Sequence, residues 1–402
     1  MASPDSELRL EQQHIPEGSR ISVAYHPGFG RYYHEFYSQL LRHLYFDGPA
    51  ESLDGKHFPI GFAKHQVDDA DFYAALDHSN SRHPDCIIAP VWFAPPMDKS
   101  LFHILEMASA FTARHSNTEF PLTNRFLCVF PYAELRQDRN SPIDMRTYWR
   151  EEASESVTAQ MLANTLKANG VTEAILLEPH SSQAVDYFDA GGINTLCLTA
   201  APIFADWLII NNHADSNTDV VALDEGSAQK CIHLQTILCR RTNLPIGLSV
   251  LRKLRSGHSE VDKETLIYGN PKGRKAIIFD DIGASFESIL RTGEALVQYE
   301  CLQVVPCLTH GVFAGKYVEN IVRAASKGVI PRVAVTNSLP QSDSANFLPL
   351  GIDVLPIEQM LAFFAREVAI RSIAEVKTDL RYQDYILTPR PKGEVVTELL
   401  TQ

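Results

Sequence analysis

The chain alternates short, unbroken apolar runs with longer segments whose apolar residues recur at helical spacing. Apolar runs between turn signals predict strands buried on both faces, as in parallel sheets. We predict strands at 21–25, 85–91, 126–130, 174–177, 220–223, 246–251, 276–279, 304–308 and 333–336. We predict helices at 32–46, 69–81, 100–114, 155–169, 227–238, 286–299 and 357–373. This alternation indicates an α/β fold with parallel sheets flanked by helices.

The alternation runs through both halves of the chain, and 402 residues are enough for two domains of ordinary size. Residues 1–19 lack the pattern and are predicted to form a loosely attached arm. We expect one domain over 20–198 and a similar one over 199–345. Residues 346–402 are expected to supply a helix that returns to the first domain and a C-terminal extension.

The stretch from Lys275 to Leu290 carries the strongest chemical signal. Its apolar strand ends in Asp280 and Asp281, a turn of small residues follows, and a helix begins near Phe286. The amides of a helix N-terminus attract an anion, and adjacent carboxylates can hold ribose hydroxyls or Mg²⁺. The stretch therefore predicts a ligand site at the carboxyl end of a sheet. A plain surface turn with acids for solubility fits this stretch equally well.

Polar residues follow other predicted strands too. A charged cluster after the strand at 126–130 suits the phosphates and base of a nucleotide, or a solvated loop. Its members are Arg136, Gln137, Asp138 and Arg139. His180 follows the strand at 174–177, and Asp224 follows the strand at 220–223. The polar, basic segment from Arg252 to Glu264 is predicted to be a mobile loop.

Composition narrows the class of protein. The net charge of −13 argues against a general nucleic-acid binder, although a local phosphate site remains compatible with it. The seven cysteines lie mostly in apolar runs, which predicts reduced core residues. We expect a cytoplasmic protein, because no apolar run has the length of a membrane span and the polar N-terminus is unlike a signal peptide. Neither a G-x-G-x-x-G after a strand nor a P-loop is found, since GNPKGRK lacks the Gly-Lys-Ser/Thr end.

Taken in order, these sites resemble the ribose-phosphate pyrophosphokinase family, which synthesises phosphoribosyl pyrophosphate. The similarity runs from about residue 86 to about residue 340, at nearly the family's spacing. R-Q-D-R at 136–139 resembles the ATP-contacting motif, and E-P-H-S-S-Q resembles D-L-H-x-x-Q. L-D-E-G resembles P-D-x-G, and R-K-L-R resembles the K-R-R of a mobile catalytic loop. THGVFAG and VTNSLP resemble T-H-G-x-F-S-G and T-N-T-I-P. No single segment is specific, and the resemblance rests on their common order.

The resemblance implies two tandem phosphoribosyltransferase-like domains and a Mg²⁺-dependent reaction. The β,γ-diphosphoryl group of ATP would pass to the anomeric hydroxyl of a ribose phosphate, releasing AMP. Metal would be held by His180 and Asp224, and Lys253 and Arg255 would be catalytic. ATP would contact the 136–139 cluster and Phe58, the latter from a neighbouring subunit of a homodimer or homohexamer. The acceptor would contact Asp280, Asp281, Gly283, Ala284, Ser285, Glu287 and Ser288.

One departure from the family concerns the acceptor. The family loop reads D-D-x-x-D-T-A-G-T, and Glu287 stands where that pattern has Gly. A carboxylate close to a phosphate is unfavourable unless a cation intervenes. The loop therefore predicts an acceptor with a larger 5-substituent, such as ADP-ribose, or ribose 5-phosphate if an arginine pairs with Glu287.

Two other functions remain open on the sequence. The altered loop favours a catalytically silent relative that regulates or scaffolds an active synthase, whereas the retained Lys253, Arg255, His180 and Asp224 oppose it. A phosphoribosyltransferase would share the fold and the acidic loop. The duplicated architecture and the Lys-x-Arg segment argue against that third function.

Overall fold

The core of the protein consists of two sheets. The structure, a computed structural model, describes residues 21–25, 60–67, 71–76, 86–94, 100–105, 108, 125–136, 158–224, 226–253, 265–328, 330–341 and 351–388. The first sheet contains β1 (Ile21–Tyr25), β2 (Ile60–Val67), β3 (Asp71–Leu76), β4 (Cys86–Phe93), β5 (Phe126–Ala133), β6 (Glu173–Leu177) and β7 (Asn194–Leu198). The second contains β8 (Thr218–Ala222), β9 (Gly247–Lys253), β10 (Thr265–Tyr268), β11 (Lys275–Ile282), β12 (Gln303–His310), β13 (Arg332–Thr336) and β14 (Gly351–Leu355).

The two sheets have the same strand order. The first runs β3-β2-β1-β4-β5-β6-β7, and the second runs β10-β9-β8-β11-β12-β13-β14. In each sheet the first pair is antiparallel and the remaining pairs are parallel. The chain therefore contains one α/β architecture twice, which confirms the predicted fold class.

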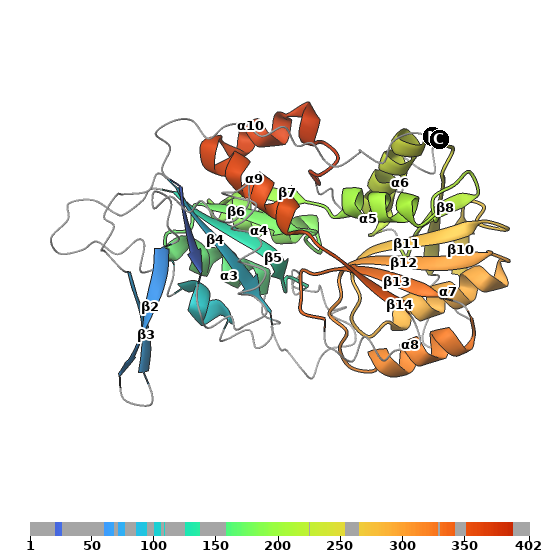
Figure 1. Cartoon of the computed structure of the whole chain (residues 1–402), viewed down its shortest axis with the longest axis horizontal. Helices are drawn as coiled ribbons and strands as arrows, with labels where there is room; N and C mark the ends of the chain where they lie inside the picture. Colours follow the sequence, from blue (N-terminus) through green and yellow to red (C-terminus); the bar gives the residue numbers. More distant parts are fainter. Residues whose placement is uncertain are drawn as a thin grey trace, which may run out of the picture.

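Helices cover the sheets on both faces. The described helices with defined bounds are α3 (Thr158–Ala168), α4 (Ser182–Ala190), α5 (Ala201–Ile210), α6 (Ala228–Thr242), α7 (Glu287–Gln298), α8 (Tyr317–Ser326), α9 (Glu358–Ile370) and α10 (Ile373–Thr378), with a 3₁₀ turn at Leu380–Tyr382. In Figure 1, α5 and α6 lie on one side of the second sheet, and α7 and α8 lie on the other.

The continuous apolar runs arise because the central strands are buried on both faces. In β11, Ile277 and Phe279 belong to the core that α5 and α6 share, whereas Ala276 and Ile278 belong to the core beneath α7 and α8. A strand covered on both faces has no position that favours a polar side chain, so alternation disappears from its sequence. All seven cysteines are free, as predicted. None of the described helices has both the length and the apolar character that crossing a bilayer requires.

The C-terminal helices return to the first sheet. In the sequence-coloured view of Figure 1, the red α9 and α10 lie over strands of the first half, and α9 packs on β4 and β5. β14, which precedes them, instead extends the second sheet beside β13. The boundaries that we predict between the domains stay a prediction.

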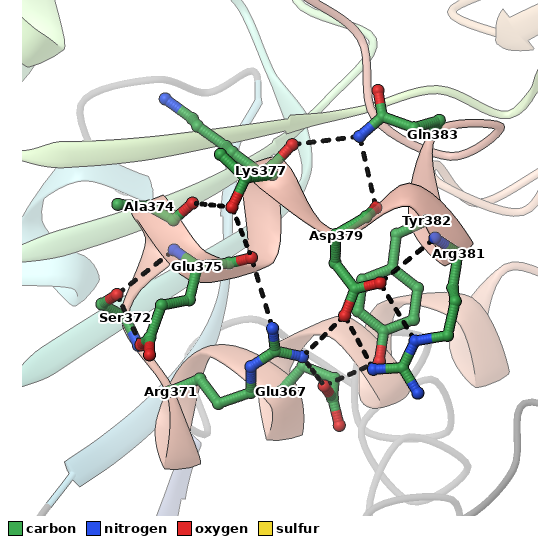
Figure 2. A network of polar contacts seen from close by, with 11 residues as sticks. Glu367, Arg371, Ser372, Ala374, Glu375, Lys377, Asp379, Arg381, Tyr382 and Gln383 are labelled. Carbon is green, nitrogen blue, oxygen red and sulfur yellow. Dashed lines mark hydrogen bonds and ion pairs between the residues drawn. The ribbon is translucent and has the colours of Figure 1, made fainter.

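Polar contacts fix the turn that follows α9 (Figure 2). The buried Glu367 accepts hydrogen bonds from Arg371 (3.0 Å) and from the hydroxyl of Tyr382 (2.8 Å). Asp379 binds Arg371 (3.1 Å) and Arg381 (2.7 Å). These contacts direct the chain toward the free edge of β7.

Residues 384–388, which we name the strap, join that edge to α6. Thr199 donates its backbone N–H to the carbonyl of Tyr385 (2.9 Å), and Leu387 donates to the carbonyl of Cys197 (3.0 Å). On the other side, Nε2 of His233 in α6 donates to the carbonyl of Asp384 (2.7 Å). The strap therefore contacts an edge of the first sheet and a helix of the second.

The predicted helix at 69–81 is wrong over 71–76, because these residues form β3. β3 pairs antiparallel with β2, which the sequence pattern did not predict. Ala74, Ala75 and Leu76 favour a helix locally, but pairing with a neighbouring strand overrides a weak local preference. The pattern also did not predict β7, β10 or β14.

Candidate functional site

The candidate site lies at the carboxyl ends of β8 and β11, where the strand order of the second sheet reverses. Asp224 follows β8 closely, and Asp280 and Asp281 lie in the last part of β11. In open α/β sheets, ligands bind outside the strand ends at such a reversal. The acidic residues predicted from the sequence therefore occupy the position at which this fold usually carries a ligand.

Asp281 is buried, and each of its carboxylate oxygens contacts a nitrogen from another element. Oδ2 lies 2.8 Å from Nδ1 of His180, which follows β6 of the first sheet. Oδ1 lies 3.4 Å from Nζ of Lys230, in the first turn of α6. Burial by itself would raise the pKa of Asp281, but Lys230 and His180 outweigh it and hold that pKa well below its usual range. The two halves of the chain therefore meet at an ionised carboxylate.

Lys230 is a site residue that the sequence patterns missed. Burial alone would lower the pKa of Lys230. The carboxylates of Asp281 and Glu178 outweigh burial and raise that pKa, so the ammonium stays charged at neutral pH. A signal was present in the sequence, since Lys230 precedes Leu234 by four residues and so shares the apolar face of the predicted helix. A lysine buried on such a face requires a carboxylate partner.

Asp280 and Asp224 form the other part of the acidic edge. Burial, the adjacent Asp281 and, to a smaller extent, Asp224 raise the pKa of Asp280 well above its usual range. Asp224 is exposed, and its Oδ1 accepts a hydrogen bond from the backbone N–H of Ser227 (3.0 Å). A bound cation would relieve the repulsion among these carboxylates.

This donor set fits Mg²⁺ that arrives together with a phosphate ligand. Within the described ranges, no group of three or more acidic, histidine or cysteine side chains is arranged to hold a metal ion. Mg²⁺ usually takes one or two carboxylates and completes its shell with water and substrate phosphates. The edge offers Asp224 and Asp280 for this purpose, and His180 is the third candidate.

The backbone on both sides of His180 is fixed. Glu178 has a φ of 44°, in the left-handed region, and its buried side chain holds it there. Its Oε2 accepts hydrogen bonds from the hydroxyl of Thr199 (2.7 Å) and from the backbone N–H of Ala200 (3.1 Å). Burial raises the pKa of Glu178. Ser181 caps the N-terminus of α4, so His180 is held between two anchored residues.

The loop between β11 and α7 is held by the segment that follows β12. A Cβ at Gly283 would lie 2.6 Å from Cδ1 of Leu308, so any larger residue there would require the side chain of Leu308 to shift. The carbonyl of Ala284 accepts a hydrogen bond from the backbone N–H of Ala314 (3.0 Å). The carbonyl of Ser285 accepts one from the side chain of Asn320 (2.8 Å). The loop thus presents the N-terminus of α7 in a fixed orientation.

Glu287 opens α7, and its carboxylate pairs with Arg291 one turn later. The distance between Nη2 of Arg291 and Oε1 of Glu287 is 2.5 Å, and both side chains are more than half exposed. Ser288 is exposed beside them. The pair makes the first turn of α7 neutral overall, so the carboxylate that departs from the family pattern has a compensating cation.

Arg136 lies at the end of β5 and is held by Glu134. Its Nε and Nη2 donate to the two carboxylate oxygens, at 2.6 and 2.8 Å. Glu134 also accepts a hydrogen bond from the hydroxyl of Tyr132 (2.7 Å). The pKa of Arg136 is raised chiefly by Glu134 and in smaller part by the charge of Asp281, so its guanidinium senses the acidic site.

The structure describes only some of the remaining predicted residues. Lys253 is the last residue of β9, and only its backbone is described. The predicted residues outside the described ranges are Phe58, Gln137, Asp138, Arg139 and Arg255. Of the predicted set, the structure therefore brings His180 into contact with Asp281, and the charges of Asp224 and Arg136 act on this acidic edge.

Comparison with known proteins finds, among others, one similar sequence and one similar solved structure. The chain is 26% identical over 312 residues to a ribose-phosphate pyrophosphokinase from Rhodopirellula baltica. The matched region covers 77% of this chain and 85% of the relative. The structure is similar to that of a phosphoribosylpyrophosphate synthetase from Mycobacterium smegmatis, with a TM-score of 0.65 and 19% identity over 87% of this chain and 99% of the other. No protein-family model matches the chain. In sequence the chain is therefore similar to a ribose-phosphate pyrophosphokinase, and it shares its duplicated fold with a phosphoribosylpyrophosphate synthetase.

Proposed function

We propose that the protein transfers the β,γ-diphosphoryl group of ATP to the anomeric hydroxyl of ribose 5-phosphate and releases AMP. The contact between His180 and Asp281 carries the proposal, because it joins the candidate ATP-side segment of the first half to the acceptor-side acids of the second. Two ligands bound at these two places would lie next to each other. Transfer of a phosphoryl group depends mainly on such positioning and on electrostatic stabilisation.

The Glu287–Arg291 pair favours ribose 5-phosphate over an acceptor with a larger 5-substituent. A carboxylate without a partner at the N-terminus of α7 would repel a phosphate dianion. With Arg291 at 2.5 Å the turn is neutral, and the backbone N–H groups of the helix start can still attract an anion. Arg291 can also turn toward the phosphate itself, because its side chain is largely exposed.

The residues of this chain then have distinct tasks. Asp280 and Asp281 orient the ribose hydroxyls, and Arg136 attracts the triphosphate from the end of β5. Lys253 and Arg255 stabilise the charge that develops on the transferred group. Asp224 and His180 would hold Mg²⁺, which, when bound, neutralises phosphate oxygens of ATP.

An AMP-release assay tests the proposal. The protein is incubated with ATP and Mg²⁺ together with ribose 5-phosphate, with ADP-ribose, or without acceptor. We expect AMP with ribose 5-phosphate, in equal amount to the acceptor consumed, and none without acceptor. AMP with ADP-ribose alone would keep the reaction but replace the acceptor. Absence of AMP with every ribosyl acceptor would refute the proposal.

A catalytically silent subunit of an active synthase is the second candidate. Ala284 favours it, because this residue stands where the family pattern has its third aspartate and supplies no carboxylate. This candidate predicts no AMP from the protein alone, together with binding to an active synthase. Co-purification with such a synthase, followed by an assay of the complex, distinguishes the two functions.

A further inference from the structure

Asp281 is already neutralised by the chain itself. Its Oδ2 lies 2.8 Å from Nδ1 of His180, and its Oδ1 lies 3.4 Å from Nζ of Lys230. Only 6% of Asp281 and 7% of Lys230 are exposed, so water screens this pair little. Asp281 and Lys230 together carry no net charge, although Asp281 belongs to an acidic edge that would otherwise attract cations.

The position of Lys230 requires an explanation. It lies in the first turn of α6, where the helix dipole disfavours a cation. A buried ammonium is also unfavourable unless carboxylates compensate it. The carboxylates of Asp281, Glu178 and Asp280 all act on Lys230, which accounts for a charged lysine at a place that both the helix and burial oppose.

We propose that the ammonium of Lys230 serves as the cation of the acceptor side, neutralising Asp281 in place of a divalent metal ion. Divalent cations then bind at Asp224 and Asp280, with His180 as the third candidate ligand, and not at Asp281. The term "acceptor side" rests on the proposed function, whereas the occupancy of Asp281 does not. The physical reason is repulsion, because a divalent ion at Asp281 would lie within a few Å of a buried ammonium.

Counting bound Mn²⁺ tests this proposal. Binding of Mn²⁺ alone to the full chain, without nucleotide, is measured from the loss of the free-ion electron paramagnetic resonance signal. We expect Lys230→Ala to bind one more Mn²⁺ per chain than the unchanged protein, because it leaves Asp281 without its cation. Lys230→Arg keeps the charge and should bind the same number as the unchanged protein. Lys275→Ala, which removes a lysine paired with Asp215 at the surface, should also leave the number unchanged.

Two further variants make the result decisive. Asp281→Asn in the Lys230→Ala background should abolish the additional Mn²⁺, which assigns that ion to Asp281. An equal count in Lys230→Ala and the unchanged protein would overturn the proposal. If Lys230→Ala does not fold, the neutral double variant Asp281→Asn with Lys230→Met decides the matter. If this double variant binds as many Mn²⁺ ions as the unchanged protein, the proposal is supported. If it binds one ion fewer, the proposal is overturned. The count is informative whether or not the protein releases AMP.

Discussion

His310 lies between the two sheets and is 2% exposed. One ring nitrogen, Nε2, lies 3.2 Å from the carbonyl of Leu177 in the first half. A carbonyl only accepts, so Nε2 carries the proton, and Nδ1 accepts a hydrogen bond from the hydroxyl of Ser338 (2.8 Å). The neutral ring satisfies both partners. Protonation would remove the acceptor and leave a buried charge, and burial lowers the pKa of His310 to about 4.

This low pKa predicts acid sensitivity of the fold. Below pH of about 6.5, His310 takes up a proton in the unfolded chain, whereas in the folded chain it does so only near pH 4. The protonation of His310 therefore lowers the free energy of unfolding by about 3 kcal/mol as the pH falls from about 6.5 to about 4. His310→Gln should lack that part of the pH dependence. Urea unfolding of both proteins between pH 7 and pH 4 measures the free energy of unfolding at each pH. An equal loss of that free energy in the two proteins over this range would contradict the prediction.

Candidate site residues could be named singly from the sequence, but the residues that contact them could not. The position of Asp281 after an apolar strand marked it as a site residue. Nothing local indicates that its two oxygens contact Lys230 and His180, which lie 51 and 101 positions away in the chain. Such pairings are set by the topology of two sheets, and a single sequence carries no record of them.

At the scale of elements, unbroken apolar runs predicted the buried strands well, because burial on both faces leaves a strong signal. Edge elements were missed for the opposite reason. β14 is exposed or half-buried throughout, and its polar Asp353 pairs with Arg332 of β13. β10 is likewise an edge strand, antiparallel to β9. β14 keeps a polar residue because it has one neighbour, and β10, with four residues, is too short to give a clear pattern.

The first turn of α7 yields a prediction about the acceptor. Arg291→Ala removes the cation that compensates Glu287 and leaves a carboxylate beside the bound phosphate. Under the proposed function, the KM for ribose 5-phosphate should rise about three- to tenfold, with the KM for ATP unchanged. Steady-state AMP release measures both constants.

Two variants serve as controls for this prediction. Glu287→Gly combined with Arg291→Ala removes both charges and should restore a KM near that of the unchanged protein. Arg323→Ala removes an exposed arginine of α8 that pairs with Glu294, away from the loop, and should change neither constant. An unchanged KM for ribose 5-phosphate in Arg291→Ala would show that the pair does not influence the acceptor.

At the scale of the whole molecule, the two copies of the fold are not equivalent. In the second sheet, the order reverses between β8 and β11, beside Asp224, Asp280 and Asp281. In the first sheet the corresponding strands are β1 and β4, and β4 ends in the buried Trp92 and Phe93. Nε1 of Trp92 donates to the carbonyl of Ser338, which follows β13 (3.0 Å). At the described end of β4, the first copy therefore has aromatic residues that contact the second copy, where the second copy has acidic residues.

The duplication could be predicted from the repeated alternation, but the way in which the copies join could not. THGVFAG and VTNSLP matched family motifs without an evident task in the sequence. The structure shows that His310 and Ser338, from these two segments, contact Leu177 and Trp92 of the first half. Polar residues in these turns thus serve the contact between the sheets, a role that no local pattern distinguishes from ligand binding.

The strap offers a test of how far the C-terminal segment belongs to the folded unit. Leu387 is 5% exposed and packs in the large core beside β7, whereas Leu380, seven residues earlier, is 85% exposed. Leu387→Ala should lower the free energy of unfolding by about 2 to 4 kcal/mol, because it removes buried methyl groups and leaves a cavity. Leu380→Ala, the same substitution at an exposed position, should change it by less than about 0.5 kcal/mol. Denaturant unfolding of both variants gives the two values. Equal, small effects would mean that the strap detaches in solution and that the first sheet keeps its stability with the β7 edge uncovered.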